Sequence, residues 1–547
     1  MSGQRRSRRS SARGSRRKTR ASDALSHIPP THVFLNGIVL TMDPARPEAQ
    51  AVAILGDRIV AVGKSSELSA LAGPSTAVVD LKGATVLPGF IDCHTHLIQY
   101  GLGLKYLDLR DVRSIYELKE HVAEASKGDV DWILGRGWDQ EKFAEKRYPT
   151  RHDLDEASPE KPVLLRRLCG HICVANSTAL NEAGVDEHSV DPPGGVIDRD
   201  AEGAPTGILR ENAVDILDKA VPSPEAEEYE EAILAACQDA LKAGLTTVHC
   251  IIDSNLELRA LLKLRAAHRL PIRFYVIIPA EQLSDVNRLG LRTGFGDEWV
   301  RLGAIKIFAD GSLGARTAAL EAPYNDDPTN LGVTIHRQEE LDELVAEAHQ
   351  SDMQVAIHAI GDRASRMVLK SLAKATAQTS RELRHRIEHA SVLSQDLISE
   401  LGESGAIVSV QPHFIVSDFW LVRRLGSARA SLTYPFASLV RAGVRVVAGS
   451  DCPIEPMAPL TGIAAAVGRL QPEETITVEE GIALYTRDAA YASFDEGVKG
   501  TIERGKYADL TVLRTDPRSV NASEISGIQV ALTVVGGEIM YRSHDSN

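Results

Sequence analysis

The stretch Pro88-Gly-Phe-Ile-Asp-Cys-His-Thr-His-Leu97 places two histidines, His94 and His96, at the end of an apolar run. On a β-strand this spacing puts both imidazoles on the same side. The run 84–91 is short and apolar, and we expect it to form the first strand of a buried parallel sheet. An isolated His-x-His pair fits one capping and one solvated histidine equally well, so the evidence for a site must come from the rest of the chain.

Seven further apolar segments follow, separated by stretches of helical character. They are residues 246–250, 273–278, 303–308, 354–359, 385–389, 406–411 and 444–449. Strands that alternate with helices indicate a parallel sheet, and eight such strands predict an α/β fold of the (β/α)8 (TIM) barrel type, with its chemistry at the C-terminal strand ends. The chain between the first two strands is too long for one crossover, so we expect a large insertion at about 105–240. Within it, residues 194–211 resemble a hairpin, either a lid or a plain surface excursion.

Both ends of the folded chain carry short apolar pieces of a different style. Near the N-terminus, Asn36-Gly37 and Gly56-Asp57 occupy turn positions between such pieces, and Gly536-Gly537 does so near the C-terminus. This pattern predicts a small antiparallel sheet. Because edge strands need partners, we expect the two ends to pair into one β domain.

These patterns divide the chain into four parts. Residues 1–28 are dense in Arg and Ser and almost free of apolar side chains, which predicts a disordered basic tail. Residues 29–84 and 501–547 are assigned to the two halves of the terminal β domain, and 85–500 to the barrel with its insertion.

The composition of the 547 residues excludes several classes of protein. A formal net charge of -14 argues against nucleic acid as the main partner. No apolar run approaches the roughly 20 residues that a membrane-spanning helix needs. Six sparse cysteines favour a reducing compartment, and we expect a cytoplasmic protein. The partner that remains is a small molecule, with homo-oligomerisation left open.

Side chains of the kinds that bind metal ions recur at the predicted strand ends. They are His94, His96, Lys306, His358, His389 and Asp451. Any one of them alone is more often structural than a ligand. Their convergence on one rim of a barrel is hard to explain by packing, because buried imidazoles and carboxylates need partners, and a pair of divalent cations supplies them.

Several longer motifs resemble the amidohydrolase superfamily, in its YtcJ-like and AepA-like branch (the amidohydrolase 3 type), which includes N-substituted formamide deformylases. They are residues 88–96, 305–320, 358–364, 386–389 and 449–453, and the resemblance extends from about Thr31 to Arg542. It implies a TIM barrel with a composite β-sandwich from both termini. It also implies a zinc-type centre, often with two Zn²⁺, bridged by a lysine carboxylated on its side-chain nitrogen.

The resemblance also implies a mechanism. His94, His96, Lys306 and Asp451 would hold the more buried metal, and Lys306, His358 and His389 the outer one. A metal-activated hydroxide would then hydrolyse a non-peptide C–N bond of an amide or formamide, with Asp451 as the catalytic general acid and base. Two alternatives remain for Lys306: a cation that replaces one metal, or a base poised by the field of a single metal. The metal's identity also stays open.

Substrate contacts are expected from residues outside the ligand set. Arg316 is a candidate clamp for a substrate carboxylate or carbonyl, or else a structural partner of Asp310 or Glu321. His171 and Trp138, in the insertion, are candidates to reach the substrate. The alternative to an enzyme is a catalytically idle scaffold or binding protein, whose expected sign is the loss of ligand residues.

Overall fold

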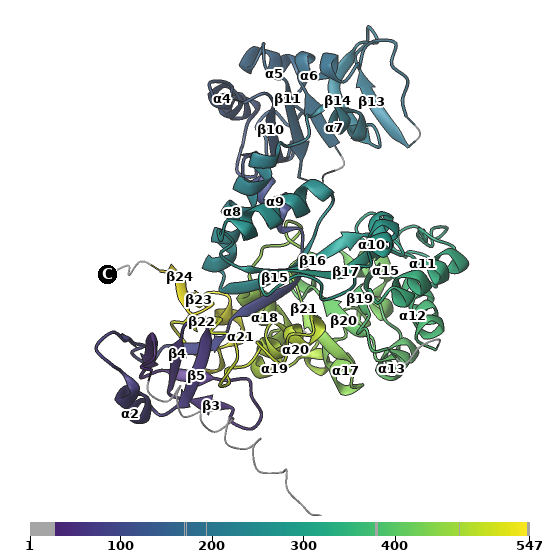
Figure 1. Cartoon of the computed structure of the whole chain (residues 1–547). Coiled ribbons are helices and arrows are strands. Elements are labelled where there is room, and N and C mark those ends of the chain that lie inside the picture. The colour runs from purple at the N-terminus through teal and green to yellow at the C-terminus, as the bar shows by residue number, and fades with distance from the viewer. Residues whose placement is uncertain are drawn as a thin grey trace, which may run out of the picture. The chain divides into compact units, whose positions relative to one another are not determined.

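A computed structural model describes residues 28–543 except 129, 169, 171, 193, 378–380 and 470 (Figure 1). The predicted basic tail, apart from Ile28, lies outside the described residues. Two compact units are present: Ile98–Ala236 form one, and the chain up to Leu97 and from Cys237 onward forms the other. The insertion was expected at about 105–240. Within the described chain, no helix combines the length and the apolar character that crossing a bilayer demands.

The second unit is built around a parallel barrel, which confirms the predicted fold class. Eight strands of the described chain form one sheet in the order β21-β20-β19-β18-β17-β16-β15-β8. A parallel bridge between Thr95 and Cys452 joins the two ends of this order. The strands are β8 (Phe90–Thr95), β15 (Leu245–Ile251), β16 (Arg273–Pro279), β17 (Val300–Phe308), β18 (Gln354–Ala359), β19 (Arg386–His389), β20 (Ile407–Val410) and β21 (Arg445–Ala448).

Helices connect successive strands, as the alternating pattern predicts. Among them are α9 (Asn255–Ala266), α10 (Leu283–Leu289), α11 (Gln338–Gln350), α12 (Asp362–Thr376), α13 (Gln395–Ser404), α17 (Phe436–Arg441) and α18 (Pro459–Val467). Every residue of β15 is buried, as expected for a strand that is covered by helices on one face and faces the barrel interior on the other.

The run 84–91 is not one strand, which corrects the sequence-based expectation. Residues Thr85–Pro88 form β7, which belongs to the terminal β domain, and the barrel begins with β8. Between them, the N–H of Gly89 donates to Asp509 and the N–H of Phe90 donates to Gly244. A Cβ on Gly89 would lie 2.3 Å from the Thr246 side chain, so the chain needs glycine where it passes from one sheet to the other.

The terminal domain is a sandwich of two sheets shared by both ends of the chain. Within the described residues, one sheet has the order β5-β4-β1-β6 and the other β24-β23-β22-β7-β2-β3. Their strands are β1 (His32–Leu35), β2 (Ile38–Leu40), β3 (Glu48–Ala49), β4 (Ala51–Leu55), β5 (Arg58–Gly63), β6 (Ala77–Asp80), β22 (Leu510–Leu513), β23 (Val530–Val535) and β24 (Glu538–Arg542). Phe34 and Ile54 of the first sheet and Val86 and Leu510 of the second pack in one buried cluster.

The turn expected at Asn36-Gly37 does not close a hairpin. β1 and β2 lie in different sheets, and each pairs in parallel with a later strand, so the domain is mixed rather than purely antiparallel. The other predicted turns do join antiparallel neighbours, β4 with β5 and β23 with β24.

The unit Ile98–Ala236 has its own sheet and core. In the part of it that is described, the strand order is β13-β14-β12-β11-β10-β9. These strands are β9 (Leu107–Asp108), β10 (Ile133–Trp138), β11 (Val163–Arg167), β12 (Ile172–Ala175), β13 (Gly195–Arg199) and β14 (Pro205–Glu211), with helices α4 (Ile115–Ser126), α5 (Arg151–Ala157), α6 (Ser177–Glu182) and α7 (Val214–Ala220). β13 and β14 form an antiparallel hairpin, at the position predicted for one.

Candidate metal centre

The C-terminal ends of five barrel strands bring the six candidate side chains together. His94 Nε2 and His96 Nε2 lie 3.4 and 3.6 Å from Asp451 Oδ1, and Lys306 Nζ lies 3.4 Å from His94 Nε2. The His389 ring centroid is 4.9 Å from that of His94 and 4.5 Å from that of His358. His94, His389 and Asp451 each offer a ligand atom within 4.8 Å of the other two.

The backbone locks the first and last strand ends together at this point. The N–H of Asp451 donates to His94 at 2.7 Å, and the N–H of His96 donates to Cys452 at 2.8 Å. Asp451 and His389 both adopt left-handed backbone conformations, with φ of 57° and 74°. Such conformations cost roughly 1–3 kcal/mol for residues other than glycine, and they recur where a site holds a side chain in a required direction.

A buried ion pair orients His94. Its Nδ1–H donates to Glu388, whose carboxylate is also held by the guanidinium of Arg386 at 2.8 Å. All three residues are fully buried or nearly so. Although burial alone would raise the pKa of Glu388, Arg386 and His94 hold it well below its usual value. Because the carboxylate only accepts hydrogen bonds, it fixes the proton of His94 on Nδ1 and leaves Nε2 facing the other candidates.

Acceptors outside the candidate set also orient His389, which is buried, and His358, which is partly exposed. His389 Nδ1–H donates to Gln411 Oε1 at 2.7 Å, which leaves Nε2 free for a ligand. His358 is turned the other way, because its Nε2–H donates to the Gly311 carbonyl at 3.1 Å and Nδ1 remains. Both tautomers are therefore set by acceptors outside the candidate set.

The carboxylate of Asp92 binds backbone N–H groups of two strand ends and is not part of the candidate ligand set. Its carboxylate accepts from the N–H of His94 and from both the N–H and the hydroxyl of Ser450. Burial raises its pKa to about 6. The first and last barrel strands are thus joined by this side chain directly beneath the candidate centre.

Burial disfavours positive charge throughout the cluster. It lowers the pKa of Lys306 to about 8, that of His96 to about 4 and that of His358 to about 3. The pKa of Asp451 lies below its usual range, because His94, His389 and His96 together outweigh the effect of burial, which would raise it. Burial thus favours the neutral form of His96, His358 and His389 beside the ionised carboxylate of Asp451, and a neutral imidazole is the form that binds a metal ion.

A family model described as "Amidohydrolase family" matches residues 77–541. The chain belongs to the amidohydrolase family. This confirms the expected family.

Individual amidohydrolases are similar over nearly the whole chain. The putative amidohydrolase YtcJ of Bacillus subtilis (strain 168) is 36% identical over 93% of this chain and 99% of its own length. The N-substituted formamide deformylase of Arthrobacter pascens is 30% identical over 93% and 98%. The crystal structure of an uncharacterized metal-dependent hydrolase from Pyrococcus furiosus superposes with a TM-score of 0.79 at 34% identity and covers 89% of this chain and 100% of that one. The chain is therefore a metal-dependent hydrolase of the YtcJ-like branch.

The residues present fit the divalent metal that the amidohydrolase family implies. Imidazole nitrogens and a carboxylate are the ligand types that zinc, iron, manganese and nickel accept. The tautomers leave Nε2 of His94, Nε2 of His389 and Nδ1 of His358 available to such an ion. Among the described residues, the carboxylate of Asp451 forms no salt bridge with an arginine or lysine.

The structure places two of the three predicted substrate contacts, Arg316 and Trp138, in structural interactions. Arg316 has a left-handed backbone (φ 59°), and its guanidinium forms two hydrogen bonds with Asp326, at 3.1 and 2.9 Å. Its ion-pair partner is thus neither Asp310 nor Glu321. Trp138 is fully buried in the core of the unit Ile98–Ala236, where its indole N–H donates to Leu165, so it has no surface to offer a substrate in this structure. His171 lies outside the described residues.

Glu388, Gln411 and Arg386 are the functional residues that sequence reasoning left without a role. The sequence does contain a signal for Arg386 and Glu388. Arg386 and Glu388 stand two apart on a buried strand, hence on one face, and two charges there require each other or a third partner. For Gln411 no comparable signal exists, because an amide after a strand fits many roles.

Proposed function

We propose that this amidohydrolase hydrolyses a C–N bond other than a peptide bond in a small amide or formamide, with Asp451 as general acid and base. The observation that carries the proposal is the meeting of His94, His389 and Asp451 within 4.8 Å at the barrel's C-terminal rim. The similarity to the N-substituted formamide deformylase of Arthrobacter pascens supports the amide class.

The ligand set would divide between two ions. His94 and His96 lie within 3.6 Å of Asp451, and the His358 and His389 rings are 4.5 Å apart. We assign the first three to one ion and the last two to the other, with Lys306, 3.4 Å from His94, shared by both. Zinc is our candidate, since it takes imidazole and carboxylate ligands readily. When bound, such ions lower the pKa of water to about 7 and polarise a substrate carbonyl.

Lys306 would serve as an N-carboxylated, anionic bridge. Carboxylation requires an unprotonated amine, and burial lowers the pKa of Lys306 to about 8, which makes that form more accessible near neutral pH. No described carboxylate forms an ion pair with its Nζ within 4.0 Å, so the modification breaks no existing salt bridge.

Asp451 moves the proton in this account. Its carboxylate is ionised, because its pKa lies below the usual range. It can therefore accept a proton from the attacking water, and it can pass that proton to the leaving nitrogen. The backbone of Asp451 is left-handed, and its N–H donates to the His94 carbonyl. These two features hold the carboxylate at the rim of the barrel, beside the imidazoles.

Asp451→Asn tests this role. We expect kcat to fall by about 10²–10⁴, the usual range for loss of a general acid and base, while the metal content falls much less. The measurement is amine release from a panel of N-substituted formamides and N-acyl amino acids, alongside elemental analysis of both proteins. An unchanged kcat would remove Asp451 from the mechanism.

A further inference from the structure

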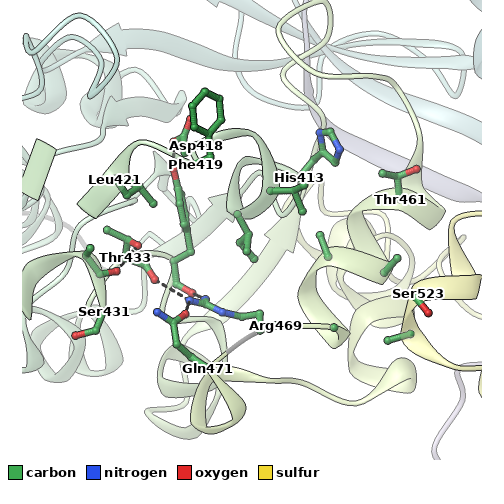
Figure 2. A pocket seen from close by; sticks show the side chains of 18 of the residues that line it. His413, Asp418, Phe419, Leu421, Ser431, Thr433, Thr461, Arg469, Gln471 and Ser523 are labelled. Carbon is green, nitrogen blue, oxygen red and sulfur yellow. Dashed lines mark hydrogen bonds between the residues drawn. The ribbon is translucent and has the colours of Figure 1, made fainter. Parts of the chain in front are cut away.

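A large cavity lies outside the six-residue centre, within the barrel unit (Figure 2). It is bounded by the segment 413–434 that follows β20, by α18 and by α21 (Ala522–Ile525). Its volume is about 1100 Å³. Sites for small molecules usually enclose roughly 300–1000 Å³, so the space is ample for one.

The cavity is roomy because one wall is made of small residues. Thr461, Ala464, Ala465 and Gly468 line it, and their spacing of three, four and seven puts them on one face of α18 and its C-terminal end. The opposite wall is apolar and comes from the segment after β20, with Ile415, Val416, Leu421 and Val422 among its residues.

A buried cation with an unmet donor lines this space. Arg469 is 8% exposed, and Figure 2 shows its side chain among the lining residues. Its terminal nitrogens donate to the carbonyls of Thr433 and Tyr434 and to Gln471, but its Nε is buried without a partner. No described carboxylate lies within 4.0 Å of its nitrogens. Burial lowers its pKa, and the more distant Glu474 and Glu473 only partly offset that effect. A buried charge in this condition is costly unless an anion completes it.

The one acid in the lining is already engaged elsewhere. The carboxyl group of Asp418 accepts a hydrogen bond from the Tyr434 hydroxyl, and the backbone carbonyl of the same tyrosine accepts from Arg469. Tyr434 thus contacts the acid through its hydroxyl and the guanidinium through its backbone carbonyl, and the acid forms no ion pair with Arg469. A ligand with a second anionic group near Asp418 would be repelled, so a single charged end suits the cavity.

We propose that this cavity binds a small molecule with an apolar body and one carboxylate, the carboxylate at Arg469 and the body between α18 and the segment after β20. Carboxylates are the natural partners of a guanidinium, and bonds between charged groups are about twice as strong as neutral ones.

The cavity wall is continuous with the elements that hold His389. Phe414, at the start of α14 (Phe414–Ser417), lies with its ring 6.4 Å from the His389 ring and within 19° of parallel. The next two residues of that helix line the cavity, and the N–H of Tyr434 donates to Ser391, two residues beyond His389. The carboxylate ligand is either part of a substrate or a separate molecule, and competition experiments distinguish the two.

Octanoate is a suitable probe, with 1-octanol as the uncharged control of equal chain length. We expect calorimetry on the metal-loaded full chain to show saturable octanoate binding, at least about tenfold tighter than octanol binding. Ala464→Phe, which fills the space from α18, should weaken octanoate binding by about tenfold or more. Ala373→Phe makes the same change on the exposed face of α12 and should leave binding unaltered.

Two further arms complete the test. Arg469→Gln should weaken octanoate but not octanol; if that variant does not fold, Ala464→Phe still decides. Octanoate inhibition that is competitive with an amide substrate assigns the site to the substrate's carboxylate, and non-competitive behaviour assigns it to a separate ligand.

The proposal fails on any of three results. These are the absence of saturable octanoate binding, equal binding of octanoate and octanol, and an unchanged affinity in Ala464→Phe. A further result would also overturn the proposal: octanoate does not bind, sedimentation shows a dimer, and Val416→Trp dissociates that dimer. Val416 is 61% exposed, so the apolar rim of the cavity would then be an interface between two copies of the chain.

Discussion

Three imidazoles of the centre each have one nitrogen hydrogen-bonded to a protein acceptor before any ion binds. Glu388, Gln411 and the Gly311 carbonyl take these nitrogens of His94, His389 and His358. Outer partners of this kind fix ring orientation and raise ligand basicity. The direction of the free nitrogens is therefore a property of the protein alone, and it can be tested by changing the partner and not the ligand.

Gln411→Leu is the cleanest such change. The amide oxygen of Gln411 accepts from His389, whereas its nitrogen is buried without a partner, so the substitution leaves the Nδ1–H of His389 without its acceptor and removes the unmet amide donor of Gln411. We expect metal affinity to fall about 10–100-fold, measured by competition with a chromogenic chelator. Gln395→Leu, on the exposed start of α13, is the control. Equal affinities in the two variants would deny Gln411 its role.

The side chains that meet at the candidate centre were predictable, whereas the residues that orient them mostly were not. His94, Lys306, His358 and Asp451 stand at the ends of recognisable strands, and parallel strands end on one rim. Glu388 lies 294 residues from His94. Such a pairing depends on how the barrel closes and in what register, which periodicity along the chain does not specify.

At the scale of elements, the centre depends on the seam where β21 meets β8. Gly449 follows β21 at this seam, and a Cβ there would lie 2.4 Å from the backbone nitrogen of His94 and 2.8 Å from Asp92 Oδ1. These neighbours are a strand backbone and a buried carboxylate that is already hydrogen-bonded. Neither can yield without moving His94.

Gly449→Ala should therefore damage both stability and metal binding. We expect a loss of about 1–3 kcal/mol, the usual cost of overpacking a close contact, together with weaker metal retention. Thermal unfolding with and without added metal measures the two effects. Gly497→Ala is the matched control, because a Cβ there meets nothing within 4 Å. If Gly449→Ala is as stable and retains as much metal as this control, the centre does not depend on close packing where β21 meets β8.

The errors in predicting elements share a cause. The run 84–91 reads as one apolar strand, and Asn36-Gly37 reads as a hairpin turn, yet each is a point where the chain passes from one sheet to another. Local sequence reports that a strand ends or turns, but the choice of the next partner depends on residues far along the chain. Gly89, for example, bonds to Asp509.

At the scale of the whole molecule, the two ends of the described chain complete one domain that leads into the barrel. β22 pairs with β7, and β7 continues through Gly89 into β8, the strand that carries His94. Arg273, the first residue of β16, also forms two hydrogen bonds with Asp509, just before β22. The C-terminal strands are thus part of the support of the centre.

Truncation after Gly500 tests this dependence. The shortened chain leaves the β7 edge and the buried cluster of the sandwich open, and the guanidinium of Arg273 unpaired, which predicts aggregation or loss of a cooperative unfolding transition. Size-exclusion chromatography and calorimetry measure these outcomes. A truncated chain that remains monomeric, binds metal and unfolds at the original temperature would show that the barrel stands without its terminal domain.

The most direct test of the central claim is the metal content of the purified full-length protein. The account predicts one to two divalent ions per chain, with loss of most of the metal in a His94→Asn or His389→Asn variant and loss of amide hydrolysis after chelation. Protein that is folded and hydrolyses amides with fewer than about 0.1 ions per chain, or that keeps its metal when both histidines are replaced, would contradict it.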